Sequence, residues 1–150
     1  MSETCVFCAI VARSSPASYV AESASAVAFL TIGPIRTGHT LVVPKRHVVE
    51  FPDASASELA GILELGSEVA RLQRRALCST GETLFLASGL AGEQSVFHLH
   101  LHVVPRHDGD GLDLTSWWQH KMHSPARETL DSIAKLLSAG LQPHSQPTSD

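Results

Sequence analysis

The sequence has few basic residues and no long apolar run, and these two shortages exclude two classes of partner. Eleven lysines and arginines stand against 15 acidic residues, so the formal net charge is −4 and no overall positive field would attract a nucleic-acid backbone. No apolar run approaches the ~20 residues that a membrane span needs. We therefore expect neither a nucleic-acid polymer nor a membrane as a partner.

Cysteine is also scarce, with three residues in the whole chain. Residues 1–9 lack the basic start and apolar stretch of a signal peptide, so we expect a cytoplasmic location and no disulfide framework. Cys5 and Cys8 are separated by two residues and are candidates for metal ligands or redox thiols. Cys78 has no evident partner and is expected to pack as a small apolar residue.

The size and apolar content of the chain suit one folded domain. The 150 residues are 43% hydrophobic, which is enough to bury a core. Segments rich in Val, Phe and Tyr and bounded by turn residues predict five strands, with Pro44 and Pro105 as stops: residues 18–22, 26–32, 39–43, 82–88 and 95–104. We expect a single domain over residues 1–140 and a flexible polar tail over 141–150.

Two helices are predicted besides a brief helical turn near the N-terminus. Ser55 and Glu58 match a capping box, and apolar residues then recur at helical spacing to about Ala76. Ser124-Pro125 predicts the start of a last helix that runs to about Ala139. Three strands, a long helix and then two strands predict an α+β fold with an antiparallel sheet, because regular βαβ alternation is missing.

Three histidines alternate with apolar residues in the run His98-Leu-His-Leu-His-Val-Val104. Side chains in a strand alternate between faces, so the three imidazoles are expected on one face and Leu99, Leu101 and Val103 on the other. The outer two histidines would have Cα atoms ~13 Å apart in a strand. Because zinc–imidazole bonds are only ~2.0 to 2.1 Å long, at most two of the three are expected to share an ion.

The central histidine suits nucleophilic catalysis. A neutral imidazole with a hydrogen bond at one nitrogen keeps a lone pair on the other, so His100 is a candidate nucleophile toward phosphorus. His102 would then face the negative charge that develops on the attacked group. The preceding loop contains Gly89, Gly92, Gln94 and Ser95, which offer backbone N–H groups, an amide and a hydroxyl for phosphate oxygens. The same loop also fits an ordinary connection between two strands.

Cys5 and Cys8 supply half of a tetrahedral zinc shell, and either His47 or His98 fits as a further ligand. Four protein ligands would close the shell, so the zinc would be structural and would fix the segment that carries His100. A redox role for the cysteine pair requires a preceding strand, which is not expected before Cys5. Two free thiols packed as apolar groups are the remaining alternative.

These motifs resemble the histidine triad family of nucleotide hydrolases and transferases, in its zinc-containing bacterial-type branch. The resemblance covers most of the chain and rests on a few segments in family order: Cys5-Val-Phe-Cys8, Ala28-Phe-Leu, Gly38-His-Thr-Leu-Val-Val-Pro-Lys45, Gln94-Ser95 and the histidine run. It implies a five-stranded antiparallel sheet with two helices, a homodimer, and a nucleoside phosphate derivative attacked at the α-phosphorus. It also implies that His100 forms a nucleotidyl-histidine intermediate, with no catalytic cofactor.

The resemblance assigns further residues by position. His102, Gln94 and Ser95 would contact the phosphate or leaving group, and His39 matches a further histidine beside the triad. Zinc ligands would be Cys5, Cys8, His47 and His98, in agreement with the ligand count above. The expected substrate-binding positions are Thr31, Ala87, Ser88, Gly92 and Glu93.

Three of these positions depart from the family pattern. Thr31 replaces an acidic or amide residue that grips the ribose hydroxyls, Ala87 replaces a frequent asparagine, and Glu93 replaces a glycine. We therefore hypothesise that the phosphorus chemistry persists while nucleotide affinity is weakened or redirected. Two rival readings are a non-catalytic dimer that binds a nucleotide, another phosphate ligand or a protein, and a metalloenzyme that uses two histidines of the run. No role is assigned to Trp117, Trp118, His120 and His123.

Overall fold

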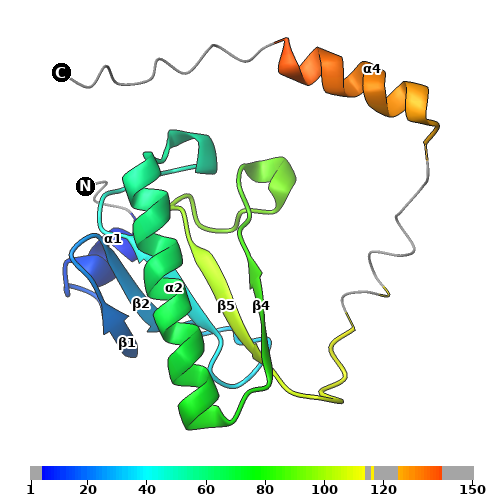
Figure 1. Ribbon diagram of the computed structural model, residues 1–150. Helices are drawn as coiled ribbons and strands as arrows, with labels where there is room; N and C mark the ends of the chain where they lie inside the picture. Colours follow the sequence, from blue (N-terminus) through cyan, green and yellow to red (C-terminus); the bar gives the residue numbers. More distant parts are fainter. Residues whose placement is uncertain (1–4, 114–115, 117–124, 140–150) are drawn as a thin grey trace, which may run out of the picture. The chain divides into compact units, whose positions relative to one another are not determined.

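The computed structural model describes residues 5–113, 116 and 125–139, and it divides the chain into two units, Met1–Asp110 and Gly111–Asp150. The described part of the first unit contains five strands, two α-helices and two 3-10 helices, most of which Figure 1 labels. In chain order they are α1 (Val6–Val11), β1 (Tyr19–Glu22), β2 (Ala26–Leu30), β3 (Thr40–Pro44), η1 (Phe51–Asp53), α2 (Ala56–Leu77), β4 (Gly81–Phe85), η2 (Leu90–Gly92) and β5 (Leu101–Arg106). The strands form one antiparallel sheet in the order β1-β2-β3-β5-β4. The predicted α+β fold with a five-stranded antiparallel sheet is confirmed.

The second unit contains helix α4 (Arg127–Ser138), within the span predicted for the last helix. The apolar side chains of α4 are exposed. The predicted tail, residues 141–150, lies outside the described residues, as do Trp117, Trp118, His120 and His123. The single domain over residues 1–140 stays a prediction.

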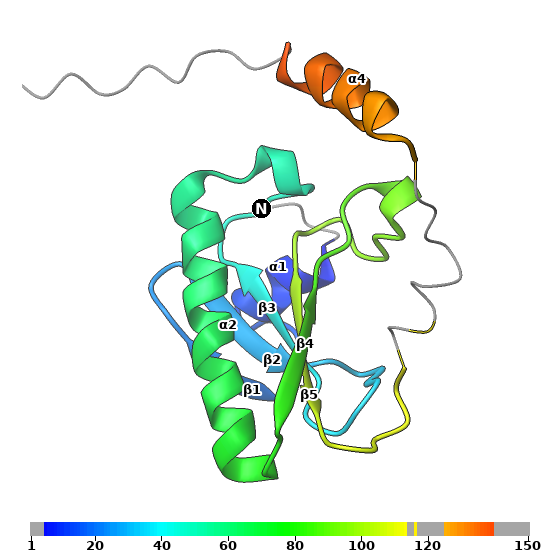
Figure 2. The same cartoon turned by 45° about the vertical axis from the view of Figure 1, so that its right-hand side comes forward.

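The sheet is covered on both faces, and its side chains alternate between them. Ala28, Val42 and Val103 pack toward α2 in one cluster. Phe29 and Leu41 point to the opposite face and pack with residues of α1. Figures 1 and 2 show the long helix α2 across one face and α1 behind the other. Because both faces are buried, β2 and β3 are continuous apolar runs rather than half-polar strands.

Helix α2 begins and ends within about one residue of its predicted bounds. Ser55 accepts the N–H of Glu58 while the Glu58 carboxylate accepts the N–H of Ser55, which is the reciprocal bonding of a capping box. Arg46 also pairs with Glu58, and its guanidinium lowers the pKa of that carboxyl to about 2. The helix ends at Leu77, and its C-cap residue is Cys78, which has a left-handed φ of 54° and is exposed. The prediction that Cys78 packs as a small apolar residue is therefore wrong.

The predicted bounds of the last two strands are wrong at the two ends that face the connecting loop. β4 ends at Phe85 rather than Ser88, and β5 begins at Leu101 rather than Ser95. β5 starts late because the backbone N–H groups of the two residues His98 and Leu99 donate to carbonyls outside the sheet. The N–H of His98 donates to Val96, and the N–H of Leu99 donates to the carbonyl of Val48.

Pro105 does not stop β5, contrary to prediction, whereas β3 ends at Pro44 and includes it. Pro44 pairs with Ala26 in β3, and Pro105 pairs with Glu82 in β5. The pairing between β3 and β5 spans only Thr40–Val42 on the β3 side, so each proline lies where its strand has a neighbour on one side alone. A missing N–H is tolerated at such a position, as it is on an edge strand.

We expect Leu65→Ala to lower the free energy of unfolding by about 2 to 5 kcal/mol, because Leu65 is 2% exposed in the core under α2 and its truncation leaves a cavity. Leu63→Ala is the matched control, since Leu63 lies on the same helix and is 55% exposed. Its expected change is within about 0.5 kcal/mol. Urea unfolding of both variants measures the difference, and equal losses would contradict the placement of this helix face.

Candidate metal centre and histidine site

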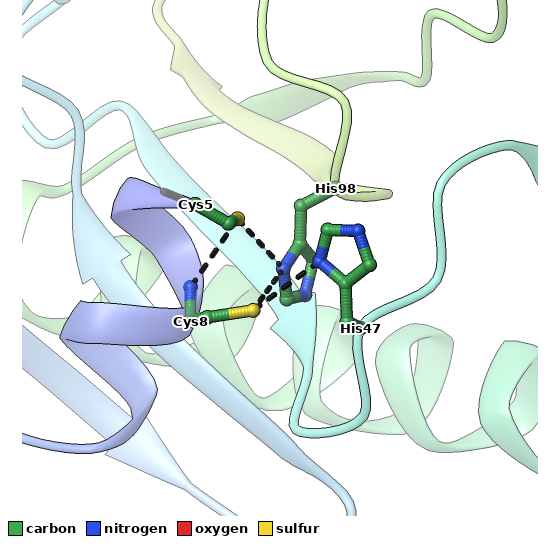
Figure 3. Close-up of side chains that lie close together, drawn as sticks. All are labelled: Cys5, Cys8, His47 and His98. Carbon is green, nitrogen blue, oxygen red and sulfur yellow. Dashed lines mark hydrogen bonds between the residues drawn. The ribbon is translucent and has the colours of Figure 1, made fainter. Parts of the chain in front are cut away.

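Four predicted ligands meet beside α1. The ligand atoms of Cys5, Cys8, His47 and His98 all lie within 4.8 Å of one another. Cys8 Sγ is 3.2 Å from His47 Nδ1 and 3.6 Å from His98 Nδ1, and Cys5 Sγ is 3.5 Å from His98 Nδ1 (Figure 3). Zinc bonds of ~2.3 Å to sulfur and ~2.0 Å to nitrogen place the two atom types about 3.5 Å apart in a tetrahedral shell. The donor set and its spacing therefore fit a closed, structural zinc site.

Local backbone structure orients this site. Cys5 is the N-cap of α1, and its sulfur accepts the N–H of Cys8, so both cysteines lie in the first turn of this helix. His98 donates its Nε2–H to the carbonyl of Pro44 at 2.9 Å. That bond leaves the Nδ1 lone pair of His98 facing the two sulfurs, as a metal-bound imidazole requires.

The neighbouring histidine, His100, is anchored but does not join this cluster. Its Nδ1–H donates to the carbonyl of His98 at 2.8 Å, which leaves Nε2 as the nitrogen with the free lone pair. Burial lowers the pKa of His100, so the ring is neutral near pH 7. A neutral, anchored imidazole with a free Nε2 is the form that a nucleophilic histidine needs.

His102 is oriented by His39, which lies directly before β3. The N–H of Ile35 donates to His39 Nδ1 at 3.2 Å, and His39 Nε2 lies 2.9 Å from His102 Nδ1. Since His39 Nδ1 accepts, the proton of neutral His39 is on Nε2 and is donated to His102. His102 then carries its own proton on Nε2 and can donate it. Burial, and to a lesser extent the charges of His100 and His39, lower the pKa of His102 to about 3.

The three histidines thus share one face as predicted, although only His102 belongs to β5. The rings of His100 and His102 are 4.8 Å apart, whereas Leu99 and Leu101 pack on the α2 face. The metal cluster contains His98 and neither of the other two, in agreement with the distance argument. The alternation of faces was therefore predicted correctly even where the strand bounds were not.

The loop between β4 and the histidines is held by Gln94, which is 3% exposed. Its Oε1 accepts the N–H of Gly89 at 2.8 Å, and its Nε2 donates to the carbonyls of Val49 and Val96. The N–H groups of residues 92, 93 and 94 donate to Gly89 and Leu90 within the loop. The loop donors expected for phosphate are thus already paired, whereas Ser95 is exposed beside them. Phosphate contacts by Gln94 and Ser95 stay predictions.

The predicted substrate-binding residues lie on two loops. Thr31 donates its backbone N–H to the carbonyl of His39, and its hydroxyl oxygen accepts the N–H of Gly33. Ser88 follows Ala87 and accepts the N–H of Phe51 with its hydroxyl. Gly92 and Glu93 are exposed, and Glu93 has a left-handed φ of 64°, a backbone conformation that favours glycine. Substrate binding by all five residues stays a prediction.

Two aromatic residues that the sequence analysis did not select contact the histidines. The Phe7 ring meets His100 edge-on with centroids 5.2 Å apart, and the Phe85 ring stacks on His102 at 4.1 Å. A phenylalanine in an apolar segment carries no sequence signal for such a contact. Only the position of Phe7 between the two cysteine ligands indicates, from the sequence, that this side chain lies near the metal centre.

Comparison with known proteins defines the class of this fold and site. The HIT domain profile matches residues 12–109, so the chain belongs to the HIT, or histidine triad, family. The chain is 37% identical over 131 residues to an uncharacterised HIT-like protein of Mycobacterium tuberculosis, with 87% of this chain and 90% of that protein covered. It is 34% identical over 103 residues to the adenosine 5′-monophosphoramidase of Schizosaccharomyces pombe, with 69% and 74% covered.

A solved structure agrees with the metal centre. The zinc-bound histidine triad family protein of Mycobacterium smegmatis superimposes with a TM-score of 0.73 at 38% identity, over 93% of this chain and 99% of that one. Together with the Cys2His2 cluster, this likeness assigns a structural zinc to the chain. Family membership supports nucleotide-related hydrolase or transferase activity in general. Among the described residues, no helix is long and apolar enough to cross a membrane.

We expect Cys8→Ser to reduce the zinc content from about one ion per chain to nearly none. The free energy of unfolding should fall by several kcal/mol, because the binding of zinc to a closed site contributes to the stability of the folded chain. Cys78→Ser is the matched control, since Cys78 is exposed and outside the cluster. Metal analysis and thermal unfolding measure both effects. Full zinc content in Cys8→Ser would overturn the assignment of this ligand.

We expect the stability of the protein to fall faster with acid in the wild type than in His102→Asn. The pKa of His102 is about 3 in the folded protein against an ordinary 6.5, so between these values the unfolded chain binds a proton that the folded protein does not. The contribution of neutral His102 to the free energy of unfolding is therefore fully present above pH ~6.5 and is lost progressively as the pH falls toward the folded pKa of about 3. Denaturant unfolding from pH 6 to 4 should show a slope steeper by about 1.4 kcal/mol per pH unit in the wild type. Parallel curves would contradict a neutral, buried His102.

Proposed function

We propose that this protein is a nucleotide hydrolase or transferase that acts through a covalent nucleotidyl-histidine at His100. The observation that carries the proposal is the hydrogen bond from His100 Nδ1–H to the carbonyl of His98, which leaves Nε2 free to attack. The kinship with an adenosine 5′-monophosphoramidase supports a nucleoside phosphoramidate as the first substrate to test. The chemistry needs no catalytic metal, since the nucleophile is a neutral imidazole.

In the proposed first step, the His100 Nε2 lone pair forms a bond to the α-phosphorus and the bond from phosphorus to the leaving group breaks. The leaving group departs with the bonding electron pair, and His102 is placed to donate its Nε2–H to it. His39 supports this role because its own Nε2–H bond holds His102 in the donor tautomer. In the second step, water or another acceptor attacks phosphorus and gives its proton to Nε2 of His102, the phosphorus–nitrogen bond breaks, and both His100 and His102 return to their starting neutral forms.

Substrate recognition in this proposal differs from the family pattern at Thr31 and Glu93. The Thr31 hydroxyl already accepts the N–H of Gly33, which supports a weakened grip on ribose. The Glu93 carboxylate is exposed in a loop whose backbone N–H groups are largely paired. Both observations favour an altered affinity or substrate choice with the phosphorus chemistry intact.

We also propose a homodimer, as the family resemblance implies. β4 is an edge strand, and its Leu84 and Phe85 side chains are 47% and 39% exposed. An exposed apolar edge strand favours pairing with another chain.

The cytoplasmic location stays a prediction.

The experiment that tests the proposed chemistry is intact-protein mass spectrometry after mixing with adenosine 5′-phosphoramidate. We expect the wild type to gain a transient adenylyl adduct and His100→Asn to gain none, because asparagine lacks the attacking nitrogen. His107→Asn is the control, since His107 is exposed and its ring bonds to the carbonyl of Leu77. The same adduct on His100→Asn would refute His100 as the nucleophile, and no adduct on the wild type with any nucleotidyl donor would favour a non-catalytic binding protein.

A further inference from the structure

The short helix that carries the cysteine ligands also contacts the proposed nucleophile through one side chain. Phe7 lies between Cys5 and Cys8 in the sequence and belongs to α1. Its ring is 7% exposed and meets the His100 ring edge-on, with centroids 5.2 Å apart and an interplanar angle of 78°. We propose that Phe7 is a positioning residue for His100 and transmits the placement of the zinc-binding helix to the nucleophile. This inference rests on the proposed function of His100.

His100 needs a second support because its one anchor leaves a degree of freedom. The bond from Nδ1–H to the His98 carbonyl orients the ring, but without a second support the ring can tilt far enough to lengthen or break that bond. Phe7 and His102 both contact the His100 ring, and their centroids are 5.2 Å and 4.8 Å from its own. A nucleophile must lie within a narrow range of angles to attack phosphorus, so the tilt of the ring affects the rate of the chemical step.

The position of Phe7 depends on the metal ligands around it. Helix α1 has only six residues, and a helix of that length has little stability of its own. Its N-terminal turn contains both cysteine ligands, and its C-terminal end is held by the Tyr19 hydroxyl, which donates to the carbonyl of Ile10. The Phe7 ring also contacts His98, the histidine ligand whose carbonyl anchors His100. Phe7 therefore lies between the metal centre and the nucleophile.

A purely structural role is the competing explanation, because Phe7 also packs against Phe29 in the core. Ile10 provides the matched control for that role. It lies on the same helix, is equally buried at 7%, and belongs to the same core cluster. Truncation of Ile10 should weaken the packing of α1 without removing the ring that contacts His100.

The test compares zinc-loaded, full-length wild type, Phe7→Leu and Ile10→Ala with adenosine 5′-phosphoramidate as the probe. We expect Phe7→Leu to lower kcat about tenfold with KM and zinc content unchanged, because it removes an edge-on aromatic contact and frees the ring to tilt. Ile10→Ala should lower the Tm and leave kcat within about twofold. An equal loss of kcat in both variants, or none in Phe7→Leu, would overturn the positioning role.

A second measurement does not depend on turnover. Nitrogen-15 spectra of the histidine rings report whether the His100 proton stays on Nδ1. We expect a single Nδ1–H form in the wild type and Ile10→Ala, and a mixture of tautomers in Phe7→Leu. If the wild type turns over no nucleotidyl donor, the proposed function fails, and the spectra alone then test whether Phe7 positions the His100 ring. Identical His100 spectra in all three proteins would then refute the inference about Phe7.

Discussion

The site depends on the way in which His98 is held. Its Nε2–H bonds to the carbonyl of Pro44 at the end of β3, and its Nδ1 faces the cysteine sulfurs. Its own carbonyl receives the Nδ1–H of His100. One residue therefore joins the sheet, the metal centre and the proposed nucleophile, so the metal ligands and His100 are connected through His98.

The same segment separates the chemical roles of three histidines that are close in sequence. His98 binds metal, His100 keeps a free Nε2, and His102 is turned into a donor by His39. Each role follows from which nitrogen is already bonded, because a neutral imidazole has one donor and one acceptor. Burial supports all three roles, since it lowers the pKa of each ring and keeps it uncharged.

Much of this arrangement could be predicted from the sequence, and the remainder depends on tertiary contacts. The alternation of His98, His100 and His102 with leucines predicted their common face because the period of two is a local property. The Cys-x-x-Cys spacing and the ligand number of zinc indicated a metal centre, and the family resemblance supplied the full set of four ligands. The start of β5 was not predictable, since it depends on the bond from Leu99 to the carbonyl of Val48, a residue about 50 positions away. The contacts of Gln94 and Phe7 depend likewise on distant chain segments, and neither residue type signals them.

The measurement that tests the central claim most directly is a titration of zinc into metal-free protein, followed by the nitrogen-15 resonances of the His100 ring. If the metal centre sets the geometry of the nucleophile, the His100 ring will change from mixed tautomers to a single Nδ1–H form as one ion binds per chain. The sheet resonances provide the internal reference for a folded chain. A His100 ring that is already in the single Nδ1–H form in folded, metal-free protein would contradict the account.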